Sequence, residues 1–160
     1  MKIVLATGGS AGHLFPAIEV AKCLRSDGHE VIFLGTFGAG KNRISDEGFT
    51  WQELQAKGLQ GNGILDDFIA VLKIIQATAQ AFSKLKKIKP QVVAGFGGYG
   101  AFPVVSAAVI LRLPTLIHEQ NVVPGRANKL LGRFVKKVAV SFNQSKTYFK
   151  SKKLVHTGCP

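Results

Sequence analysis

Three short segments of this chain hold the residues that could do chemistry. Gly8-Gly9-Ser10-Ala11-Gly12-His13 combines a glycine-rich loop with an imidazole, and Gly97-Gly98-Tyr99-Gly100 adds a phenol. His118-Glu119-Gln120-Asn121 joins a second imidazole and a carboxylate to two amides. Imidazole and carboxylate groups exchange protons, and glycine-rich backbone before a helix leaves N–H groups that favour a phosphate. The segments therefore indicate a polar ligand site, although a network in which His118 and Glu119 only pin two loops is the alternative.

The sequence comes close to two familiar nucleotide-binding motifs but matches neither. A dinucleotide fingerprint requires glycine where Thr7 stands, and the strand ending at Leu34-Gly35-Thr36 carries no acid to hold a ribose. The stretch from Gly35 to Lys41 matches a P-loop until Asn42, which lacks the hydroxyl that would ligate magnesium. We therefore expect neither an NAD enzyme nor a P-loop ATPase, and we interpret 35–42 as a glycine-rich connection.

The elements that must position these segments alternate between short apolar runs and helical patterns. This alternation predicts an α/β fold, a Rossmann-like doubly wound parallel sheet with helices on both faces. Ligands of such sheets bind at the carboxyl ends of the strands, where all three segments fall. Expected strands cover residues 2–6, 31–34, 51–54, 91–94, 115–118, 137–140 and 154–158, and expected helices cover 16–26, 42–47, 65–89, 103–111 and 126–134.

Composition and charge narrow the class of protein. The chain has 160 residues, 46% of them hydrophobic, which excludes a disordered chain and fits one domain. Its net charge is +12, and residues 120–160 hold nine basic and no acidic residues. Such a block predicts an anionic neighbour. We expect no nucleic acid there, because the chain lacks a recognised DNA- or RNA-binding motif and its aromatic spacing suits packing better than base stacking.

The cysteine content and the hydropathy of the chain indicate the cellular compartment of the protein. Cys23 and Cys159 make no metal-ligand spacing and no disulfide framework, and Cys23 is expected to be a small buried hydrophobe. The apolar start of the chain is shorter than a signal-peptide core, and no run approaches a membrane span. We therefore expect a cytoplasmic protein with no metal site.

The three segments, in this order, resemble the N-terminal domain of the MurG family of N-acetylglucosamine transferases. Pro16-Ala17, Pro124-Gly125 and Asn128 extend the resemblance, and 58–61 and 157–160 add weaker matches. The His118–Asn121 block is the most specific part. This chain departs from the family pattern at several positions, which are Ser10, Ala11, Gln60, Ala101, Phe102 and Cys159.

The resemblance implies one half of a two-domain GT-B glycosyltransferase. Residues 1–160 would be the N-terminal acceptor-binding domain, inactive alone, and the C-terminal donor-binding domain is absent from this chain. The reaction would move N-acetylglucosamine from UDP-N-acetylglucosamine to the 4-hydroxyl of the undecaprenyl-diphosphate-linked acceptor lipid I, with inversion, giving lipid II. No cofactor or metal is implied. The alternative is the acceptor-side membrane subunit of a split glycosyltransferase that acts with a separate donor-binding subunit.

Roles at the site also follow from the resemblance. His13 is the first candidate for the base, and Glu119 is a second base or an orienting group. Donor contacts are expected from Ser10, Ala11, Gly12 and Asn121, and acceptor contacts from Gly9, Gly98, Tyr99, Gln120 and Asn128.

A lipid-linked acceptor implies contact with an anionic membrane surface, so we expect a peripheral protein on the inner face of the plasma membrane. The helix expected at 65–89 carries an apolar stripe followed by lysines, which suits interfacial binding. Packing of the same stripe on the sheet is the alternative. The membrane-contact residues expected are Leu65, Phe68, Leu72, Ile75, Lys84, Lys86 and Lys87.

Overall fold

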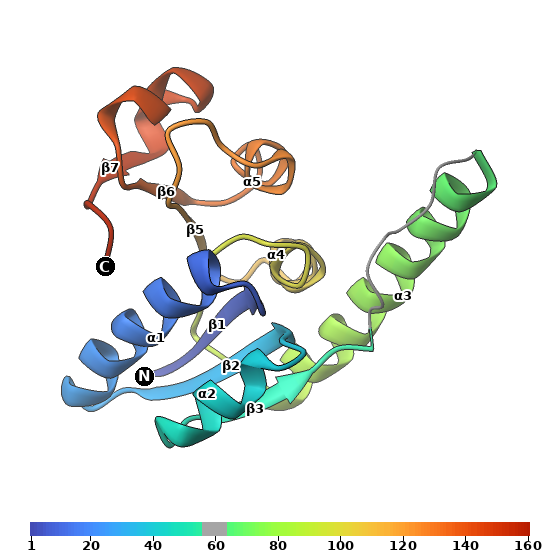
Figure 1. Cartoon of the computed structure of the whole chain (residues 1–160), viewed down its shortest axis with the longest axis horizontal. Helices are drawn as coiled ribbons and strands as arrows, with labels where there is room; N and C mark the ends of the chain where they lie inside the picture. The colour runs from blue at the N-terminus through green and yellow to red at the C-terminus, as the bar shows by residue number, and fades with distance from the viewer. Residues whose placement is uncertain (56–63) are drawn as a thin grey trace.

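The chain folds around one seven-stranded, all-parallel sheet with strand order β3-β2-β1-β4-β5-β6-β7 (Figure 1). The computed structural model describes residues 1–55 and 64–160. The strands are β1 (Lys2–Gly8), β2 (Glu30–Thr36), β3 (Thr50–Glu53), β4 (Val92–Gly95), β5 (Thr115–Glu119), β6 (Lys137–Val140) and β7 (Leu154–His156). The helices are α1 (Ala11–Ser26), α2 (Gly40–Asp46), α3 (Ile64–Ile88), α4 (Ala101–Ile110) and α5 (Arg126–Leu131), with 3₁₀ helices η1 (Asn143–Tyr148) and η2 (Ser151–Lys153).

The order of the strands reverses at β1, which confirms the Rossmann-like prediction. β1 pairs with β2 on one side, where Ile3 faces Val31, and with β4 on the other, where Ile3 faces Val92. The chain winds outward from β1 to β3 and then outward again from β4 to β7. The loops after β1 and β4 therefore diverge at the carboxyl edge, which is where doubly wound sheets bind ligands.

Each face of the sheet has its own apolar core. Val4 and Ala6 of β1 join one cluster with residues of α3 and α4, whereas Ile3 and Leu5 join a second cluster with residues of α1 and α2. This alternation follows the two-residue repeat of a strand. Burial on both faces explains why β1 is an uninterrupted apolar run.

Helix α1 starts at Ala11, so the expected start at residue 16 is wrong. Ser10 holds extended backbone before the first turn, and Pro16 lies inside the helix, where it lacks only one backbone N–H donor. The last three residues of the glycine-rich segment, Ala11, Gly12 and His13, therefore belong to the first turn of α1. Cys23 is exposed on this helix, against expectation, while Ala17 and Ala21 take the buried face.

Helix α5 and strand β7 are both shorter than expected. The helix ends at Leu131 because the next amides bond three residues back, with Phe134 N donating to Leu131 O at 2.9 Å. The strand ends at His156 because its pairing with β6 ends where His156 faces Val140. The sequence pattern also missed η1 and η2, since such short i,i+3 turns have no apolar periodicity.

Helix α3 packs on α4 and the core through the second half of its length. Ala77, Ala81, Leu85 and Ile88 are buried at helical spacing, and the last three join the core cluster formed with α4 and the sheet. The first half of α3 extends beyond the other elements (Figure 1). Within residues 1–55 and 64–160, no helix is long and apolar enough to cross a membrane.

The P-loop-like stretch is a fixed turn in the structure. One oxygen of the Glu53 carboxylate accepts hydrogen bonds from Phe37 N and Gly38 N, each at 3.1 Å. A phosphate would need these same amide donors. The turn also packs against the first glycine loop, since a Cβ on Gly9 would lie 2.0 Å from the Phe37 carbonyl oxygen.

Gly9→Ala is expected to destabilise the fold, because its methyl group would have to displace the backbone of the neighbouring loop. We expect a loss of about 1–3 kcal/mol in the free energy of unfolding, measured by urea titration. Gly12→Ala is the matched control: a Cβ on Gly12 meets nothing within 4 Å. That control should change stability by less than about 1 kcal/mol. Equal stability of the two variants would contradict the packing of Gly9.

Candidate functional site

A polar cavity of about 310 Å³ lies at the carboxyl edge of the sheet, beside the point where the strand order reverses. Its walls come from the first turn of α1, the turn after β4, the end of β5 and the start of α5. The lining residues are His13, Gly97, Gly98, Tyr99, Glu119, Asn121, Gly125, Arg126, Ala127 and Asn128.

The imidazole of His13 lies against the Gly97–Gly98 turn. Both glycines have positive φ, +84° and +75°, which L side chains rarely adopt. A Cβ on Gly97 would lie 3.1 Å from Cε1 of His13, and a Cβ on Gly98 would lie 3.0 Å from Cδ2. Glycine is therefore needed at both positions for the turn and for the close approach of the ring.

Gln120 sets the tautomer of His13. Its amide nitrogen donates to the Phe96 carbonyl at 2.9 Å, which directs its oxygen toward His13. That oxygen lies 3.4 Å from Nδ1 of His13 and can only accept a hydrogen bond. This contact favours the tautomer in which Nδ1 carries the proton and Nε2 keeps the lone pair.

The carboxylate of Glu119 is buried and fully engaged by its own loop. Its Oε1 accepts hydrogen bonds from N and Nδ2 of Asn121, at 3.0 and 3.1 Å. Its Oε2 accepts from Nδ2 of Asn128 at 2.9 Å and from Gly125 N at 3.3 Å. Because Glu119 is only 1% exposed, these four contacts hold the 120–128 loop in place and leave the carboxylate little freedom to accept a substrate proton.

The second imidazole, His118, faces away from this cavity. It is 4% exposed, its Nε2 lies 3.1 Å from the Gly158 carbonyl oxygen, and its ring packs on Phe96. Burial lowers the pKa of His118, and the Gly158 carbonyl and Glu119 only partly oppose this effect. His118 is therefore a neutral donor that ties β5 to the segment after β7.

The first turn of α1 carries open backbone donors next to His13, but Ser10, Ala11 and Gly12 are not among the residues that line the cavity. Ser10, Ala11 and Gly12 are exposed, and the Ser10 side chain makes no capping hydrogen bond. The first N–H groups of a helix have no intrahelical acceptor and carry a partial positive charge. Ala11 is not among the positive-φ residues of the described chain, so its methyl group causes no backbone strain.

Tyr99 contributes a protonated hydroxyl. The phenol oxygen is buried and has no hydrogen-bond partner among residues 1–55 and 64–160. Burial raises the pKa of Tyr99, which keeps the hydroxyl protonated near neutral pH. The hydroxyl is therefore an unpaired donor buried in the wall of the cavity.

The structure brings most of the predicted site residues to one place. His13, Gly98, Tyr99, Glu119, Asn121 and Asn128 line the cavity, and Gln120 contacts His13. Gly9 lies beneath, against the neighbouring loop, while the weaker match at 58–61 lies outside the described residues. Arg126, at the start of α5, also lines the cavity and was not among the predicted site residues; the basic block was its only signal.

In the part of the chain that is described, no group of three or more His, Cys, Asp or Glu side chains could hold a metal ion.

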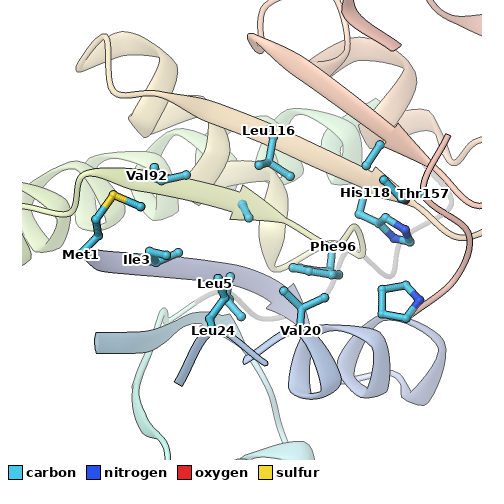
Figure 2. Close-up of a pocket in the computed structure, with 13 residues that line it drawn as sticks. Met1, Ile3, Leu5, Val20, Leu24, Val92, Phe96, Leu116, His118 and Thr157 are labelled. Atoms are coloured by element: carbon cyan, nitrogen blue, oxygen red, sulfur yellow. The ribbon is translucent and has the colours of Figure 1, made fainter. Parts of the chain in front are cut away.

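A second hollow, of about 370 Å³, opens on the sheet beside α1 (Figure 2). Ile3, Leu5, Phe96 and Leu116 point into it from the strands and the β4 turn, and Val20 faces them from α1. His118 lies at its rim. The lining is almost wholly apolar, so this hollow lacks the groups that the first cavity offers to a sugar or a phosphate.

Comparison with known proteins decides the family. The model of the glycosyltransferase family 28 N-terminal domain matches residues 3–140, which include His13, the glycine turn after β4 and the 118–121 block. This chain belongs to that family. The match spans β1 to β6, which are the elements that position the cavity described above.

Two relatives of this family 28 domain carry the same name. UDP-N-acetylglucosamine–N-acetylmuramyl-(pentapeptide) pyrophosphoryl-undecaprenol N-acetylglucosamine transferase of Caldanaerobacter subterraneus is 43% identical over 100% of this chain and 45% of the relative. The enzyme of the same name from Acetivibrio thermocellus is 38% identical over 100% of this chain and 44% of the relative. The chain thus spans less than half the length of these relatives.

Solved structures agree with the family. The crystal structure of Acinetobacter baumannii MurG has a TM-score of 0.84 and 33% identity over 99% of this chain and 45% of that chain. The UDP-GlcNAc 2-epimerase of Neisseria meningitidis has a TM-score of 0.71 but 16% identity, over 99% of this chain and 46% of that chain, and so shows the fold alone.

The buried neutral His118 predicts a pH-dependent stability. The folded-state pKa of His118 lies below the ordinary 6.5, so as the pH falls the unfolded chain binds a proton there first. The free energy of unfolding should therefore decrease through this group as the pH drops from about 7.5 to about 5. His118→Gln keeps a donor near the Gly158 carbonyl but does not titrate. Urea titrations should show a smaller loss in this variant, and an equal loss in both chains would contradict the assignment.

Proposed function

We propose that this family 28 domain is the acceptor-binding N-terminal half of a two-domain inverting glycosyltransferase. The reaction is the transfer of N-acetylglucosamine from UDP-N-acetylglucosamine to the 4-hydroxyl of lipid I, giving lipid II. The names of the relatives support the substrates, and their length supports a second, donor-binding domain. The chain alone is then inactive, and the proposal involves no metal or cofactor.

The observation that carries the proposal is the contact between Gln120 and Nδ1 of His13, which favours a lone pair on Nε2. Gln120 holds the proton on Nδ1, and the ring lines the polar cavity at the carboxyl edge. Nε2 accepts the proton of the 4-hydroxyl while that oxygen bonds to the anomeric carbon of the donor. The bond from this carbon to the β-phosphate oxygen breaks, and UDP leaves with the electron pair. Attack opposite the leaving group gives inversion.

The neighbours of His13 have supporting roles in this proposal. Gln120 accepts from Nδ1 and stabilises the imidazolium as it forms, at a distance of 3.4 Å in the free domain. Glu119 is a positioning residue, because its four donors hold the loop that carries Gln120 and Asn121. Tyr99 and Gly98 shape the wall of the acceptor site.

The start of α1 is the proposed site for phosphate. Ser10, Ala11 and Gly12 are exposed at the start of the helix, directly before the cavity residue His13, where the helix dipole favours an anion. Arg126 lies on the opposite wall. A diphosphate of the acceptor or donor can be held between these groups, with Asn121 and Asn128 contacting the sugars.

His13→Ala in a two-domain enzyme that contains this domain should lower kcat by about 10²–10⁴, the usual contribution of a general base. KM for both substrates should change much less, since the ring makes its essential contact in the transition state. His29→Gln is the matched control, because His29 lies before β2, at the amino edge of the sheet. Lipid II formation at saturating substrate measures both variants. An undiminished kcat in the His13 variant would remove this residue from the mechanism.

We further propose that the domain associates peripherally with the inner face of the plasma membrane through α3. Leu72 and Ile75 are 50% and 59% exposed, and neither takes part in the face that packs on the sheet. Lys86 and Lys87 are exposed farther along the helix, whereas Lys84 is half-buried and donates to Gln52 at 3.2 Å. The side chains of Leu65 and Phe68 lie outside the described residues. Exposed apolar groups followed by cations suit an anionic lipid interface.

Ile75→Ser should weaken binding of the domain to lipid vesicles by about tenfold, because it removes an exposed aliphatic side chain that would enter the lipid. Val155→Ser is the matched control, since Val155 is also exposed but lies on β7. Co-sedimentation with vesicles measures both variants. Unchanged binding of the Ile75 variant would contradict contact through α3, and equal binding of the unmodified chain to neutral and anionic vesicles would contradict the electrostatic part.

A further inference from the structure

The side-chain amides of Asn121 and Asn128 have a fixed orientation at the polar cavity, and one residue orients both. Both asparagines line the cavity. An asparagine amide has an NH₂ end that donates hydrogen bonds and a carbonyl end that accepts them, so its orientation decides which ligand groups it can meet. The ionised carboxylate of Glu119 can only accept hydrogen bonds. An amide that contacts this carboxylate must therefore turn its NH₂ group toward it.

Asn121 is held by three hydrogen bonds that leave its side-chain oxygen open. Its Nδ2 and its backbone N both donate to Oε1 of Glu119, at 3.1 and 3.0 Å. Its backbone carbonyl accepts from the hydroxyl of Ser145 at 2.9 Å, and Ser145 is 0% exposed. Asn121 itself is exposed, and no hydrogen bond to its Oδ1 is found among residues 1–55 and 64–160. The end of this amide that is left for a ligand is therefore an acceptor.

Asn128 is held in the same sense by two acceptors. Its Nδ2 donates to Oε2 of Glu119 at 2.9 Å and to the backbone carbonyl of His118 at 3.2 Å. The residue is 3% exposed, and its Oδ1 is buried without a hydrogen-bond partner in the part of the chain that the structure describes. A buried acceptor without a partner is costly, so it gains from a ligand that brings a donor.

The Asn128 amide lies near the imidazole that carries the proposed chemistry. A Cβ on Gly97 would lie 3.2 Å from Nδ1 of His13 and 3.3 Å from Nδ2 of Asn128, so both groups lie against the same turn. The cation of the cavity, Arg126, can only donate hydrogen bonds. The negative charge of Glu119, next to the asparagines, further disfavours an anion on their side of the cavity. The cavity therefore offers acceptors on one side and a cationic donor at Arg126.

We propose that Glu119 makes the asparagine wall of the cavity a hydrogen-bond acceptor, which recognises the hydroxyl and N–H groups of a sugar and rejects the oxygens of a phosphate. Hydroxyl and N-acetyl N–H groups can donate to Oδ1, whereas unprotonated phosphate oxygens can only accept. The inference rests on the proposed function, in which a sugar binds here, and adds the direction in which the substrate lies. Its sugar contacts the asparagines, and its diphosphate lies away from them, toward Arg126 and the start of α1.

Glu119→Gln tests the inference, because it replaces one of two acceptor oxygens by an NH₂ donor. Asn128 should keep its orientation, since the carbonyl of His118 still accepts from its Nδ2. The new NH₂ group then faces Asn121, whose amide should turn over and present its own NH₂ group to the cavity. Glu53→Gln is the matched control, because the Glu53 carboxylate also accepts from two backbone N–H groups but lies at the end of β3.

The first measurement is the exchange of side-chain amide protons with solvent, followed by NMR in the full chain without ligand. In the unmodified chain and the control, the hydrogen bonds to Glu119 should slow this exchange at Asn121 and Asn128 about tenfold relative to the exposed Asn143. In Glu119→Gln, only Asn121 should lose this protection. Protection of Asn121 that persisted in the variant would overturn the inference, as would exchange at Asn121 in the unmodified chain as fast as at Asn143.

Two neutral probes test recognition without a difference in ligand charge. N-acetylglucosamine carries hydroxyl and N–H donors, whereas the phosphoryl oxygen of trimethyl phosphate can only accept. In the unmodified chain and the control, the sugar should shift the side-chain amide signals of Asn121, and trimethyl phosphate should not. In Glu119→Gln, trimethyl phosphate should shift them as well. Equal shifts by trimethyl phosphate in the unmodified chain and the variant would overturn the inference, as would an unmodified chain that did not respond to the sugar.

A double variant separates the orientation of the amide from damage to the loop. Glu119→Gln with Asn121→Asp exchanges the acid and the amide, which returns an acceptor oxygen to the cavity at the net charge of the unmodified chain. This variant should lose the response to trimethyl phosphate that Glu119→Gln gains, and a response that remained would overturn the inference. None of these measurements needs turnover. Their failure is therefore distinct from failure of the proposed function, which the kcat of His13→Ala decides.

Discussion

The pairing of β1 with both β2 and β4 is the constraint on which the rest of the structure depends. Because the sheet winds outward in both directions from this strand, the loops after β1 and β4 separate at the carboxyl edge. The first turn of α1 then lies beside the Gly97–Gly98 turn, and the His13 ring fits against glycines that carry no Cβ. The candidate site is therefore a consequence of strand order, completed by a loop from the next strand.

The side chains of the four consecutive residues 118–121 point in different directions and have different roles. His118 points to the apolar side and ties down Gly158, whereas Glu119 is buried beneath its own loop and accepts four hydrogen bonds. Gln120 reaches back to His13, and Asn121 is exposed at the cavity. Only Gln120 and Asn121 direct their side chains toward the proposed reaction. The other two residues of the block, His118 and Glu119, hold the structure together. The sequence interpretation in which His118 and Glu119 pin two loops describes their contacts well.

Positive charge and exposed apolar groups occur together at two places outside the cavity. On α3 the exposed Leu72 and Ile75 precede Lys86 and Lys87, and just after α5 the exposed Phe134 follows Arg133. The polar cavity, by contrast, holds one arginine and several neutral donors. This separation is consistent with a domain that meets a charged surface with one set of residues and a sugar with another.

The sequence by itself determined the sheet, its class and the positions of the three site segments. An apolar run such as that of β1 indicates a strand that is buried on both faces. The alternation of such strands with helices predicts a parallel sheet. Local pattern could not place the start of α1, because proline at residue 16 is a usual first-turn signal and only the packing of the glycine loop moves the start to Ala11. The exposure of Cys23 and the face by which α3 packs also depend on neighbours distant in sequence. Only the tertiary structure could decide that Gln120 directs the proton of His13 while Glu119 is saturated, since residues 107 positions apart meet only when β1 and β5 lie in one sheet.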